Sequence, residues 1–583
     1  MKIKKQKAES RNGPRRLFLL SAFLISALVF PGCVRREPPA DLVIINGNEP
    51  ESLDPAIITG QPEMRIVAGL FEGLTRVDPK TGGAIPGLAE RWDISPDGTV
   101  YTFHLRPNLV WSTGEPITAD AVVYSWLRAL DPMTASDYAG QLYYVKNGEG
   151  FNTGKIKDSA QVGVHALDPL TVRVELNQPT TFFLDLCAMP VMCVVPRRCI
   201  EQFGDAWIKA KPLPVSGPYE LDHWRLNDKV RLRKNSRYWD AANTSAEIID
   251  LLPVGSPNVA LNLYERGQAD IVWDKELVPT ELLDVLLKRP DFHTFNFLGT
   301  YFIRFNVTRK PFDDPRVRQA LALAVDKYRI VKRITRSGEK PASGLVPPGT
   351  ANYSASKAQL SFDPARARKL LADAGYPEGK GFPHFQYTFD AAAGGAAKMH
   401  EKVAIELQQM WRDELGIEME LRQLEWKVYL NAQSRLDYEV SRSSWIGDYN
   451  DANTFLDMFM SDNGNNQTGW KNPRYDALVR EANRQTDVPA REKLLQQAET
   501  LLVVEATPIV PVFYYVGVSY YDTNNIQGIY PNLLDLHPLQ FIKKIKRSSR
   551  RKEALTEKAA SGKQQREIEM SLLTSAATNK EAR

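Results

Sequence analysis

A strand signal is followed at once by a helix signal in residues 86–126, PGLAERWDISPDGTVYTFHLRPNLVWSTGEPITADAVVYSW. A Pro-Asp-Gly turn precedes Tyr101, Phe103 and Leu105, whose alternate spacing predicts the apolar face of a strand. Apolar residues then recur at helical spacing after Thr118, the expected N-cap of a helix. Strands and helices that alternate in this way predict layered α/β or α+β packing.

Two later segments carry complete helix signals. In residues 313–334, DDPRVRQALALAVDKYRIVKRI, Asp314 is the expected cap, Pro315 occupies the first turn and the apolar residues share one face. A shorter helix is predicted from its cap at Asp363 to its stop at Gly375. The chain has 583 residues, and a single core stops growing at roughly 250–300 residues, so we expect more than one lobe.

The charge is distributed unevenly along an otherwise ordinary globular composition, which is 43% hydrophobic and 25% charged. Residues 1–32 carry seven Lys/Arg and one Glu, and residues 543–583 carry twelve Lys/Arg and five Glu. Because the total is +4, the region between these ends has a net charge of −9. A negative body argues against a nucleic-acid partner. Residues 546–583 are interpreted as a solvated basic extension, with contact to anionic lipid as the alternative.

An export signal is predicted at the N-terminus. Residues 1–32 begin with basic side chains and continue, at residues 17–30, with the apolar run LFLLSAFLISALVF. Fourteen residues suit the core of a secretory signal and are too few to span a bilayer comfortably. The cysteine that follows resembles the end of a lipobox, although Phe30 and Pro31 depart from that pattern. We therefore expect export, with residues 1–32 removed and Cys33 as the site of lipid attachment.

Sites for covalent or metal chemistry are not recognisable in the body. The three remaining cysteines, Cys187, Cys193 and Cys199, are odd in number and have no histidine among them, which favours buried thiols over a metal site. The sequence HEKVA at His400 has Ala404 where a zinc peptidase needs a second histidine. Neither a Gly-x-Ser-x-Gly elbow nor a phosphate-binding loop is present. The sequence thus predicts a protein that is not an enzyme and needs no cofactor.

Several segments agree in order and spacing with one family. They are GNEPESLDP, LFEGLTRVDP, the opening stretch, SGPYELDHWRLNDKVRLRKNSRYW, ERGQADI, FNVTRKPFDDPRVRQALALAVDK, LLADAGYP and WIGDYNDANTFLDMFMSDNGNNQTGW. From about residue 42 to residue 541 the chain resembles the periplasmic oligopeptide-binding proteins of ABC importers, within bacterial extracellular solute-binding protein family 5. The resemblance implies a monomeric receptor that captures short peptides and delivers them to a membrane permease.

The resemblance also implies a fold. It is an α/β, two-lobed periplasmic-binding-protein fold of type II with an additional third domain, in which the chain crosses between the lobes twice and the ligand is enclosed at the hinge. The implied divisions are the signal (1–32), an anchor linker (33–41), lobe I (42–72, 197–298 and 516–545), the additional domain II (73–196), lobe II (299–515) and the extension (546–583).

One carboxylate is the main candidate for ligand binding. In the peptide-binding members, an aspartate in a Trp-x-x-Asp-Tyr-Asn segment receives the α-ammonium group of the peptide. Asp448 takes that place here, after Trp445 and before Tyr449 and Asn450. A desolvated carboxylate can form a charge-assisted bond to the amine that every free peptide carries, without reading side chains. The alternative is that Asp448 only stabilises a turn, and that Trp445 belongs to the core rather than to a pocket wall.

Other site residues follow from the same comparison of segments. Arg442 and His400 match positions that contact a ligand carboxylate, and the alternatives are a salt bridge between domains for Arg442 and a surface helix position for His400. A family lysine that serves longer peptides falls on Thr335, which leaves the preferred peptide length open. Further lining positions are Tyr138, Ser216, Gly217 and Tyr219. Some members carry a disulfide where this chain has Gly299 and Ile446, so we expect a packed contact there instead.

Three rival interpretations remain open from the sequence. A receptor of the same fold for a murein peptide, a metal chelate or a sugar would share most of these segments. An envelope peptidase would act on the same molecules, and a scaffold would use the basic tail to hold a partner. Asp448 weighs against sugars, because a sugar has no ammonium group to neutralise the carboxylate.

Overall fold

The computed structural model describes residues 37–273, 277–356, 359–391 and 395–545. The predicted signal, Cys33 and the basic extension lie outside these residues, and what the sequence predicts for them stays a prediction. Within the described part of the chain, no helix is both long enough and apolar enough to cross a membrane.

Most strands belong to one sheet of eleven strands. Its order is β15-β14-β16-β12-β17-β11-β1-β10-β9-β8, and β13 pairs with β17 outside this path. The strands are β1 (Leu42–Ile45), β8 (Tyr219–Arg225), β9 (Lys229–Lys234), β10 (Ile248–Leu252), β11 (Ile271–Val272), β12 (Phe292–Phe305), β13 (Lys340–Pro341), β14 (Phe385–Asp390), β15 (Met419–Leu424), β16 (Val440–Ile446) and β17 (Ile509–Tyr520). The sheet is mixed, because β14 runs parallel to β15 and β16 whereas β12 is antiparallel to β16 and β17.

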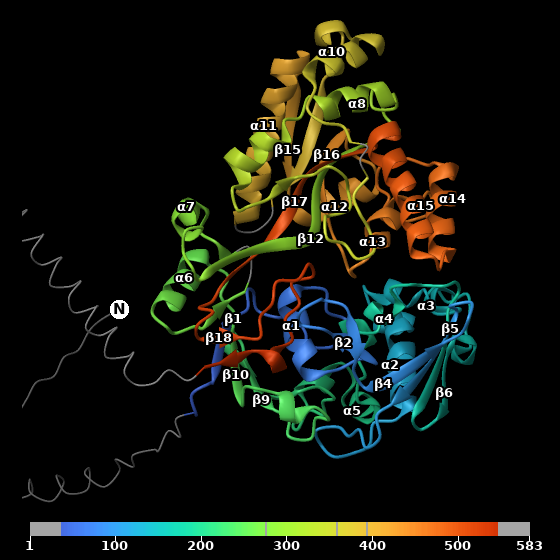
Figure 1. The fold of residues 1–583 in the computed structure, drawn as a ribbon, viewed down its shortest axis with the longest axis vertical. Coiled ribbons are helices and arrows are strands. Elements are labelled where there is room, and N and C mark those ends of the chain that lie inside the picture. The colour runs from blue at the N-terminus through green and yellow to red at the C-terminus, as the bar shows by residue number, and fades with distance from the viewer. Residues whose placement is uncertain (1–36, 274–276, 357–358, 392–394, 546–583) are drawn as a thin grey trace, which may run out of the picture. The chain divides into compact units, whose positions relative to one another are not determined.

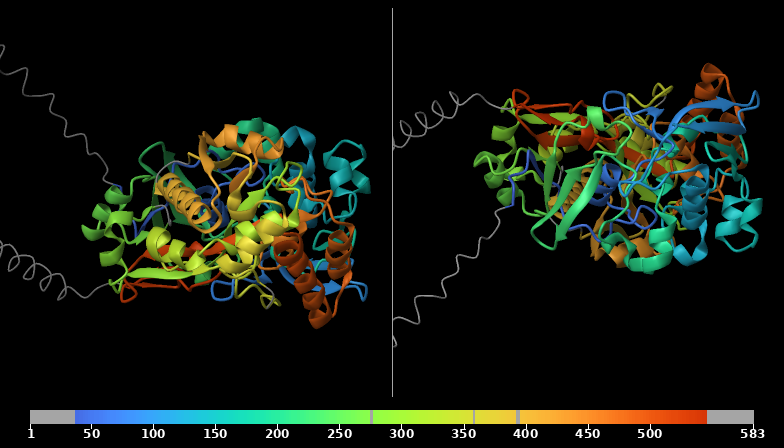
Figure 2. Two further views of the ribbon diagram at one scale, coloured as in Figure 1. Left: turned by 90° about the horizontal axis from the view of Figure 1, so that it is seen from above. Right: turned by 90° about the horizontal axis from the view of Figure 1, so that it is seen from below.

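Two long strands, β12 and β17, lie side by side and connect the two halves of this sheet (Figures 1 and 2). At one end β17 pairs with β11 through Tyr520 and Val272, and at the other end β12 pairs with β16. The register between β12 and β17 shifts between Asn296 and Thr300. The implied lobe boundaries at 298/299 and 515/516 fall inside these two strands, next to that irregularity. The candidate hinge is therefore made of sheet rather than of loops.

A second sheet has a core of its own within residues 73–196. Its order is β4-β5-β7-β6 and all its neighbours are antiparallel. The strands are β4 (Ala89–Ile94), β5 (Val100–Leu105), β6 (Val164–Asp168) and β7 (Thr171–Glu175), preceded by the hairpin of β2 (Thr75–Val77) and β3 (Ala84–Pro86). Helix α2 (Ala119–Leu130) packs against β6, and its Trp126 meets Phe183 edge to face at 6.3 Å between ring centroids. Both rings are fully buried.

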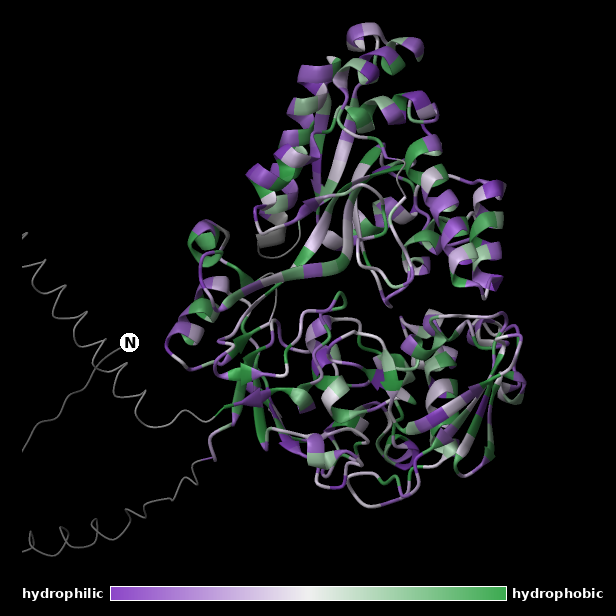
Figure 3. Ribbon diagram, viewed as in Figure 1, coloured by the Kyte–Doolittle hydropathy of each residue, from purple (hydrophilic) through white to green (hydrophobic). Residues whose placement is uncertain are grey.

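The helices present one apolar face inward. Figure 3 shows hydrophilic and hydrophobic residues alternating along α11, α14 and α15, the pattern of helices that cover a sheet or pack on one another. Besides α2, the helices are α1 (Gln61–Leu70), α3 (Gly148–Asn152), α4 (Phe183–Leu186), α5 (Arg197–Phe203), α6 (Pro257–Glu265), α7 (Leu283–Leu286), α8 (Pro315–Leu323), α9 (Lys327–Ile330), α10 (Pro364–Asp373), α11 (Gly395–Leu415), α12 (Trp426–Ser434), α13 (Asn453–Leu456), α14 (Pro473–Arg484) and α15 (Val488–Thr500). Two short strands, β18 (Ile526–Gln527) and β19 (Lys543–Lys544), form a separate pair.

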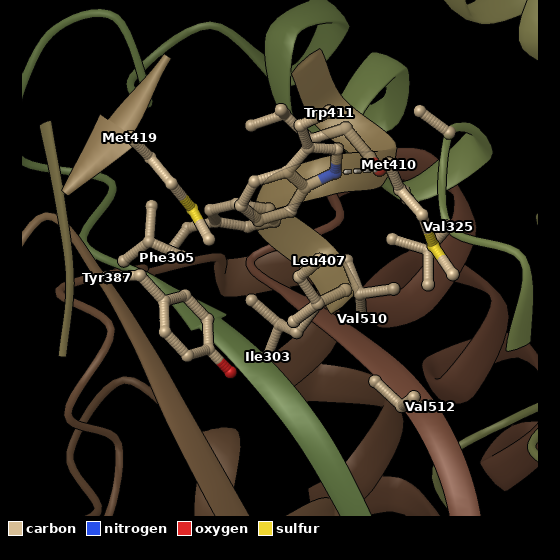
Figure 4. Packing of buried hydrophobic residues seen from close by; sticks show 14 of the residues in the cluster. Ile303, Phe305, Val325, Tyr387, Leu407, Met410, Trp411, Met419, Val510 and Val512 are labelled. Carbon is tan, nitrogen blue, oxygen red and sulfur yellow. Dashed lines mark hydrogen bonds between the residues drawn. The ribbon is translucent and has the colours of Figure 1, made fainter. Parts of the chain in front are cut away.

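The core beneath α11 holds the sheet of residues 299–515 in place. Trp411 is fully buried there and its indole N–H donates to the carbonyl of Leu321 at 3.0 Å (Figure 4). Leu407 and Met410 of the same helix are buried in the same cluster as Ile303 and Val510 of β12 and β17. These contacts hold β12 and β17 against α11, and β12 reaches the candidate site at its other end.

Most local predictions from sequence are confirmed, although Thr118, which does occupy the N-cap position of α2, makes no side-chain capping bond to the described residues. Strand β5 and the α10 cap are as predicted, since the Asp363 side chain accepts from the N–H of Arg366. The predicted helix over residues 313–334 is interrupted at residues 324–326. Helix α8 ends at Leu323, and the side chain of Asp326 caps α9 by accepting from the N–H of Arg329; a π-helical turn then continues over Val331–Thr335. An apolar period alone cannot distinguish one helix from two that share a buried face.

The cysteines are free, buried thiols, as predicted. Cys187, Cys193 and Cys199 are at most 7% exposed and none of them forms a disulfide. Burial raises the pKa of the Cys187 thiol, so these side chains act as small apolar groups.

Candidate ligand-binding cavity

A cavity of about 340 Å³ collects residues from distant parts of the chain. Its walls are formed by α1, the turn of the β2–β3 hairpin, residues 185–190, the segment 533–539, and the points where β12 and β16 approach each other. Leu298 of β12 joins two of these walls. Its carbonyl accepts from the N–H of Gly447, just after β16, at 2.8 Å, and its own N–H donates to the carbonyl of Leu533 at 2.7 Å. The lining is mainly apolar, with a few charged groups.

Asp448 is one of those charged groups. It follows the end of β16, and its backbone N–H donates to the Thr454 hydroxyl at 3.2 Å. Its carboxylate accepts from the side-chain amide of Gln141 at 3.2 Å. Burial raises the pKa of Asp448 to about 6, against the opposite effect of the Gln141 bond. Among the residues that the structure describes, no cation pairs with this carboxylate, so its charge is held in a poorly solvated place without compensation.

Three further acids lie in the same region as Asp448, and they differ in how much negative charge they contribute. Burial raises the pKa of Asp185, which also lines the cavity, to about 6, and that of Asp457 to about 7. Asp451 is neutralised by Arg491, with two contacts of 2.8 Å. This end of the cavity therefore favours a positively charged group on a ligand.

Aromatic residues close the same end. Tyr138 lines the cavity, and burial together with the charge of Asp448 raises the pKa of its hydroxyl to about 12. Tyr449 stacks on Phe182 with ring centroids 4.1 Å apart, which joins the Asp448 segment to residues 73–196. Trp445 packs with the cluster that contains α13 and does not line the cavity, and its indole N–H is buried without an acceptor within the described part of the chain.

Arg442 and His400 are not in the cavity. Both are buried, and both lie close to the same oxygen of Asp390: Arg442 Nη1 at 3.1 Å and His400 Nδ1 at 3.2 Å. Arg442 Nη2 lies 2.9 Å from His400 Nε2. Asp390 ends β14 and Arg442 lies in the neighbouring β16, so this ion pair is internal to one sheet. The salt bridge that the sequence left open for Arg442 exists, but it does not bridge domains, and His400 is not a surface residue.

The residues of the SGPY segment, 216–219, contact other parts of the protein rather than the cavity. The Ser216 hydroxyl donates to the carbonyl of Val194 at 3.2 Å and accepts from the N–H of Glu72 at 3.1 Å. Gly217 approaches the end of α1 so closely that a Cβ would lie 2.7 Å from the carbonyl carbon of Leu70. Tyr219 is fully buried in β8. None of these three lines the cavity.

Comparisons with known proteins identify the family of the chain. Residues 83–467 match the bacterial extracellular solute-binding proteins, family 5 Middle. The chain belongs to this family. The periplasmic oligopeptide-binding protein of Salmonella typhimurium is 36% identical over 86% of this chain and 91% of its own length. The probable deoxycholate-binding periplasmic protein of Escherichia coli is 36% identical over 85% and 92%.

The solved structure of the murein tripeptide-binding protein of Escherichia coli is similar to this solute-binding protein, with a TM-score of 0.74. It is 32% identical, and the match covers 88% of this chain and 99% of that one. The fold is thus the two-lobed, type II fold with an additional domain that the sequence resemblance implies.

The missing disulfide of this solute-binding protein is replaced by packing, as expected. Gly299 and Ile446 are paired neighbours on β12 and β16. The Ile446 side chain fills the space above Gly299, because a Cβ added to Gly299 would lie 2.5 Å from Ile446 Cδ1 and 3.0 Å from a Tyr515 ring atom.

This contact predicts coupled stability effects. Gly299→Ala should lower the free energy of unfolding by about 1–3 kcal/mol through overpacking, and adding Ile446→Val, which removes Cδ1, should recover part of that loss. Urea unfolding of the two single variants and the double variant measures the coupling. Strictly additive changes would show that Ile446 does not occupy the space above Gly299.

Several residues were not anticipated from the sequence: some line the cavity, Gln141 contacts Asp448, and Asp390 lies outside the cavity lining. Asp185, Gln141 and the segment 533–539 lie in stretches without a recognisable motif. A partial signal for the pairing of Asp390 was present in the sequence. This residue ends the apolar strand FQYTFD, and a charged residue at that point faces either solvent or a partner. Arg65 carried no signal at all, since an arginine on an amphipathic helix is usually exposed.

Proposed function

We propose that this protein captures short peptides outside the cytoplasm through their amino-terminal ammonium group and delivers them to an ABC importer. The observation that carries the proposal is the Asp448 carboxylate, which lines the cavity and has no cationic partner among the described residues. A bound ammonium group would supply the missing charge in a place where water is scarce, and such charge-assisted bonds are stronger than neutral ones.

The remaining affinity would come from apolar contact. The cavity is lined by leucine and methionine side chains such as Leu298, Leu534 and Met64. Such contacts select a ligand by its size rather than by the sequence of the peptide. A ligand fixed at its amine and otherwise held by apolar contacts can vary in side chain. This supports a receptor for mixed peptides, with no covalent step and with the periplasm or cell envelope as its location.

The amine contact is tested by blocking it. We expect the tripeptide Ala-Leu-Ala to bind at least about tenfold more tightly than its N-acetyl derivative, because acetylation removes the charge that Asp448 compensates. Titration calorimetry of the mature protein measures both affinities. Equal affinities would refute the role of Asp448, and intact peptide masses after incubation would distinguish a receptor from a peptidase.

A steroid acid is the second candidate, since one relative is named for deoxycholate and the cavity lining is largely apolar. The carboxylate of such a ligand would face Asp448 and Asp185, and like charges in a poorly solvated site repel. A murein peptide keeps a free amine and fits Asp448 as well as other peptides do. We therefore favour peptides over bile acids.

The pKa of Asp448 predicts opposite effects of acid on binding and stability. With a pKa of about 6, Asp448 is mostly protonated at pH 5, so peptide affinity should fall about tenfold from pH 7.5 to pH 5. A carboxyl whose pKa is raised on folding binds more protons in the folded state, so the ligand-free protein should become more stable as the pH falls from about 7 to about 5. Calorimetry and thermal unfolding across this range measure the two trends. If peptide affinity and stability both fell toward pH 5, the raised pKa of Asp448 and its role in binding the amine would be contradicted.

A further inference from the structure

Asp185 is a second carboxylate on the wall of the cavity. It lies in the short helix α4, far along the chain from the segment that carries Asp448. Its Oδ1 accepts from the backbone N–H of Ala84, the first residue of β3, at 2.8 Å. Within the described part of the chain, no donor forms a hydrogen bond with its other oxygen, Oδ2. One side of this carboxylate is therefore held by the protein and the other is left for a ligand.

The charge of Asp185 is not compensated by a cation among the described residues. Burial raises the pKa of this carboxyl to about 6, the bond from Ala84 acts against burial, and the charge of Asp451 adds to it. Arg65 also lines the cavity, but its guanidinium nitrogens lie between 3.3 and 3.5 Å from oxygen atoms of Asn46 and Gln61. A poorly solvated carboxylate without a cation is costly, so a cation brought by a ligand would be stabilised there.

The fold brings Asp185 to the same end of the cavity as Asp448. Phe182 stacks on Tyr449, with ring centroids 4.1 Å apart and 9° between the ring planes. Asp185 follows Phe182 by three residues, and Asp448 comes directly before Tyr449. The stacked rings therefore hold the two acidic segments against each other, and both carboxylates line one cavity. Two negative charges at one end of a mainly apolar cavity suit a ligand that carries two cationic groups close together.

The cavity wall beside Asp185 is built from small residues. Residues 82–84, Gly-Gly-Ala, line the cavity next to the carboxylate that Ala84 holds, and so does Ala188, whose N–H donates to the Asp185 carbonyl at 3.1 Å. A Cβ added to Gly83 would meet nothing nearer than the Thr81 hydroxyl, at 3.6 Å. The space beside this turn is thus open. A wall of small apolar residues with a carboxylate at its edge suits an aliphatic side chain with a cationic tip.

We propose that Asp185 receives a second cationic group of the ligand, so that the cavity prefers short peptides with a lysine or arginine at one of their first two residues. The inference rests on the proposed function and deepens it: the α-ammonium group meets Asp448 and the cationic side chain meets Asp185. A charge-assisted bond to the open oxygen of Asp185 would fix that side chain. The apolar lining still admits uncharged side chains, so the contact adds a preference and excludes no other peptide.

The test compares peptides that differ only in a side-chain amine: Lys-Leu-Ala with norleucine-Leu-Ala, and Ala-Lys-Ala with Ala-norleucine-Ala. In at least one pair, titration calorimetry of the wild-type mature protein should show the lysine peptide binding at least about tenfold more tightly. Asp185→Asn should abolish this preference by weakening the lysine peptide alone, because asparagine keeps the oxygen that accepts from Ala84 but loses the charge. Asp120→Asn removes an exposed acid of α2 that does not line the cavity, and this control should leave the ratio of affinities unchanged.

The outcomes separate this inference from the proposed function. Equal wild-type affinities within both pairs, or a preference that survives Asp185→Asn, would overturn the role of Asp185 while peptide capture still stood. Cadaverine has two ammonium groups and no peptide, and it should bind at least about tenfold more weakly than the preferred lysine peptide because it makes fewer contacts. Comparable binding would assign the two carboxylates to a diamine and overturn the peptide preference. Failure of the wild-type protein to bind any of the four peptides would count against peptide capture itself, and this inference would fall with it. The wild-type comparison needs no variant to fold.

Discussion

Asp448→Asn should weaken peptide binding by about 2–5 kcal/mol, the cost of removing one partner of a buried charge pair. The substitution keeps the size of the side chain and its contact with Gln141, but it removes the charge that the ligand amine would neutralise. The free energy of unfolding of the ligand-free protein should not fall and should rise at pH 7.5, because burial now disfavours the ionised carboxyl. Calorimetry and urea unfolding measure the two quantities.

Asp462→Asn is a suitable control for this prediction. Asp462 is 68% exposed in its side chain and pairs with Arg480 at the surface, so its loss should change neither binding nor stability by more than about 1 kcal/mol. Unchanged peptide affinity in Asp448→Asn would contradict the proposed contact. A loss of affinity accompanied by an equal loss of stability would mean that Asp448 acts through the fold.

Arg442→Leu should lower the free energy of unfolding by about 3–5 kcal/mol, whatever its effect on binding. The variant would remove the arginine partner of Asp390, which is fully buried, and would leave His400 as its remaining ion-pair partner among the described residues. Breaking a buried pair by removing one partner is strongly destabilising. Adding Asp390→Asn should restore a large part of the loss. Urea unfolding of the single and double variants measures the recovery.

Arg480→Leu provides the matched comparison, because it removes an arginine from an exposed ion pair. That change should cost less than about 1 kcal/mol. If Arg442→Leu were as mild as Arg480→Leu, Arg442 would not be needed to neutralise Asp390, and it would again be available to a ligand.

The sequence predicted the elements better than it predicted the partners of the charged residues. The turn and alternation around Tyr101 and the cap at Asp363 are local signals, and the structure confirms both elements. The role of Arg442 depends on Asp390, which lies 52 residues earlier in a neighbouring strand. No local pattern reveals such a pairing, since it arises only when β14 and β16 meet in the sheet.

In the candidate site, too, local signals were predictable and long-range contacts were not. The family resemblance, through the flanking Trp445 and Tyr449, singled out Asp448 as a candidate. Gln141, which donates to its carboxylate, lies 307 residues earlier in the chain and could not be predicted. Arg65 was missed because amphipathic helices usually place arginine in solvent, whereas α1 places it against the cavity. Long-range packing therefore decides which charged residues are free to meet a ligand.

The most direct test of peptide capture is mass spectrometry of the ligands released from the purified mature protein by mild unfolding. The account predicts a set of short peptides with free amino and carboxyl ends, narrow in length and mixed in sequence. A single compound without an ammonium group would contradict it and would leave Asp448 without its proposed partner.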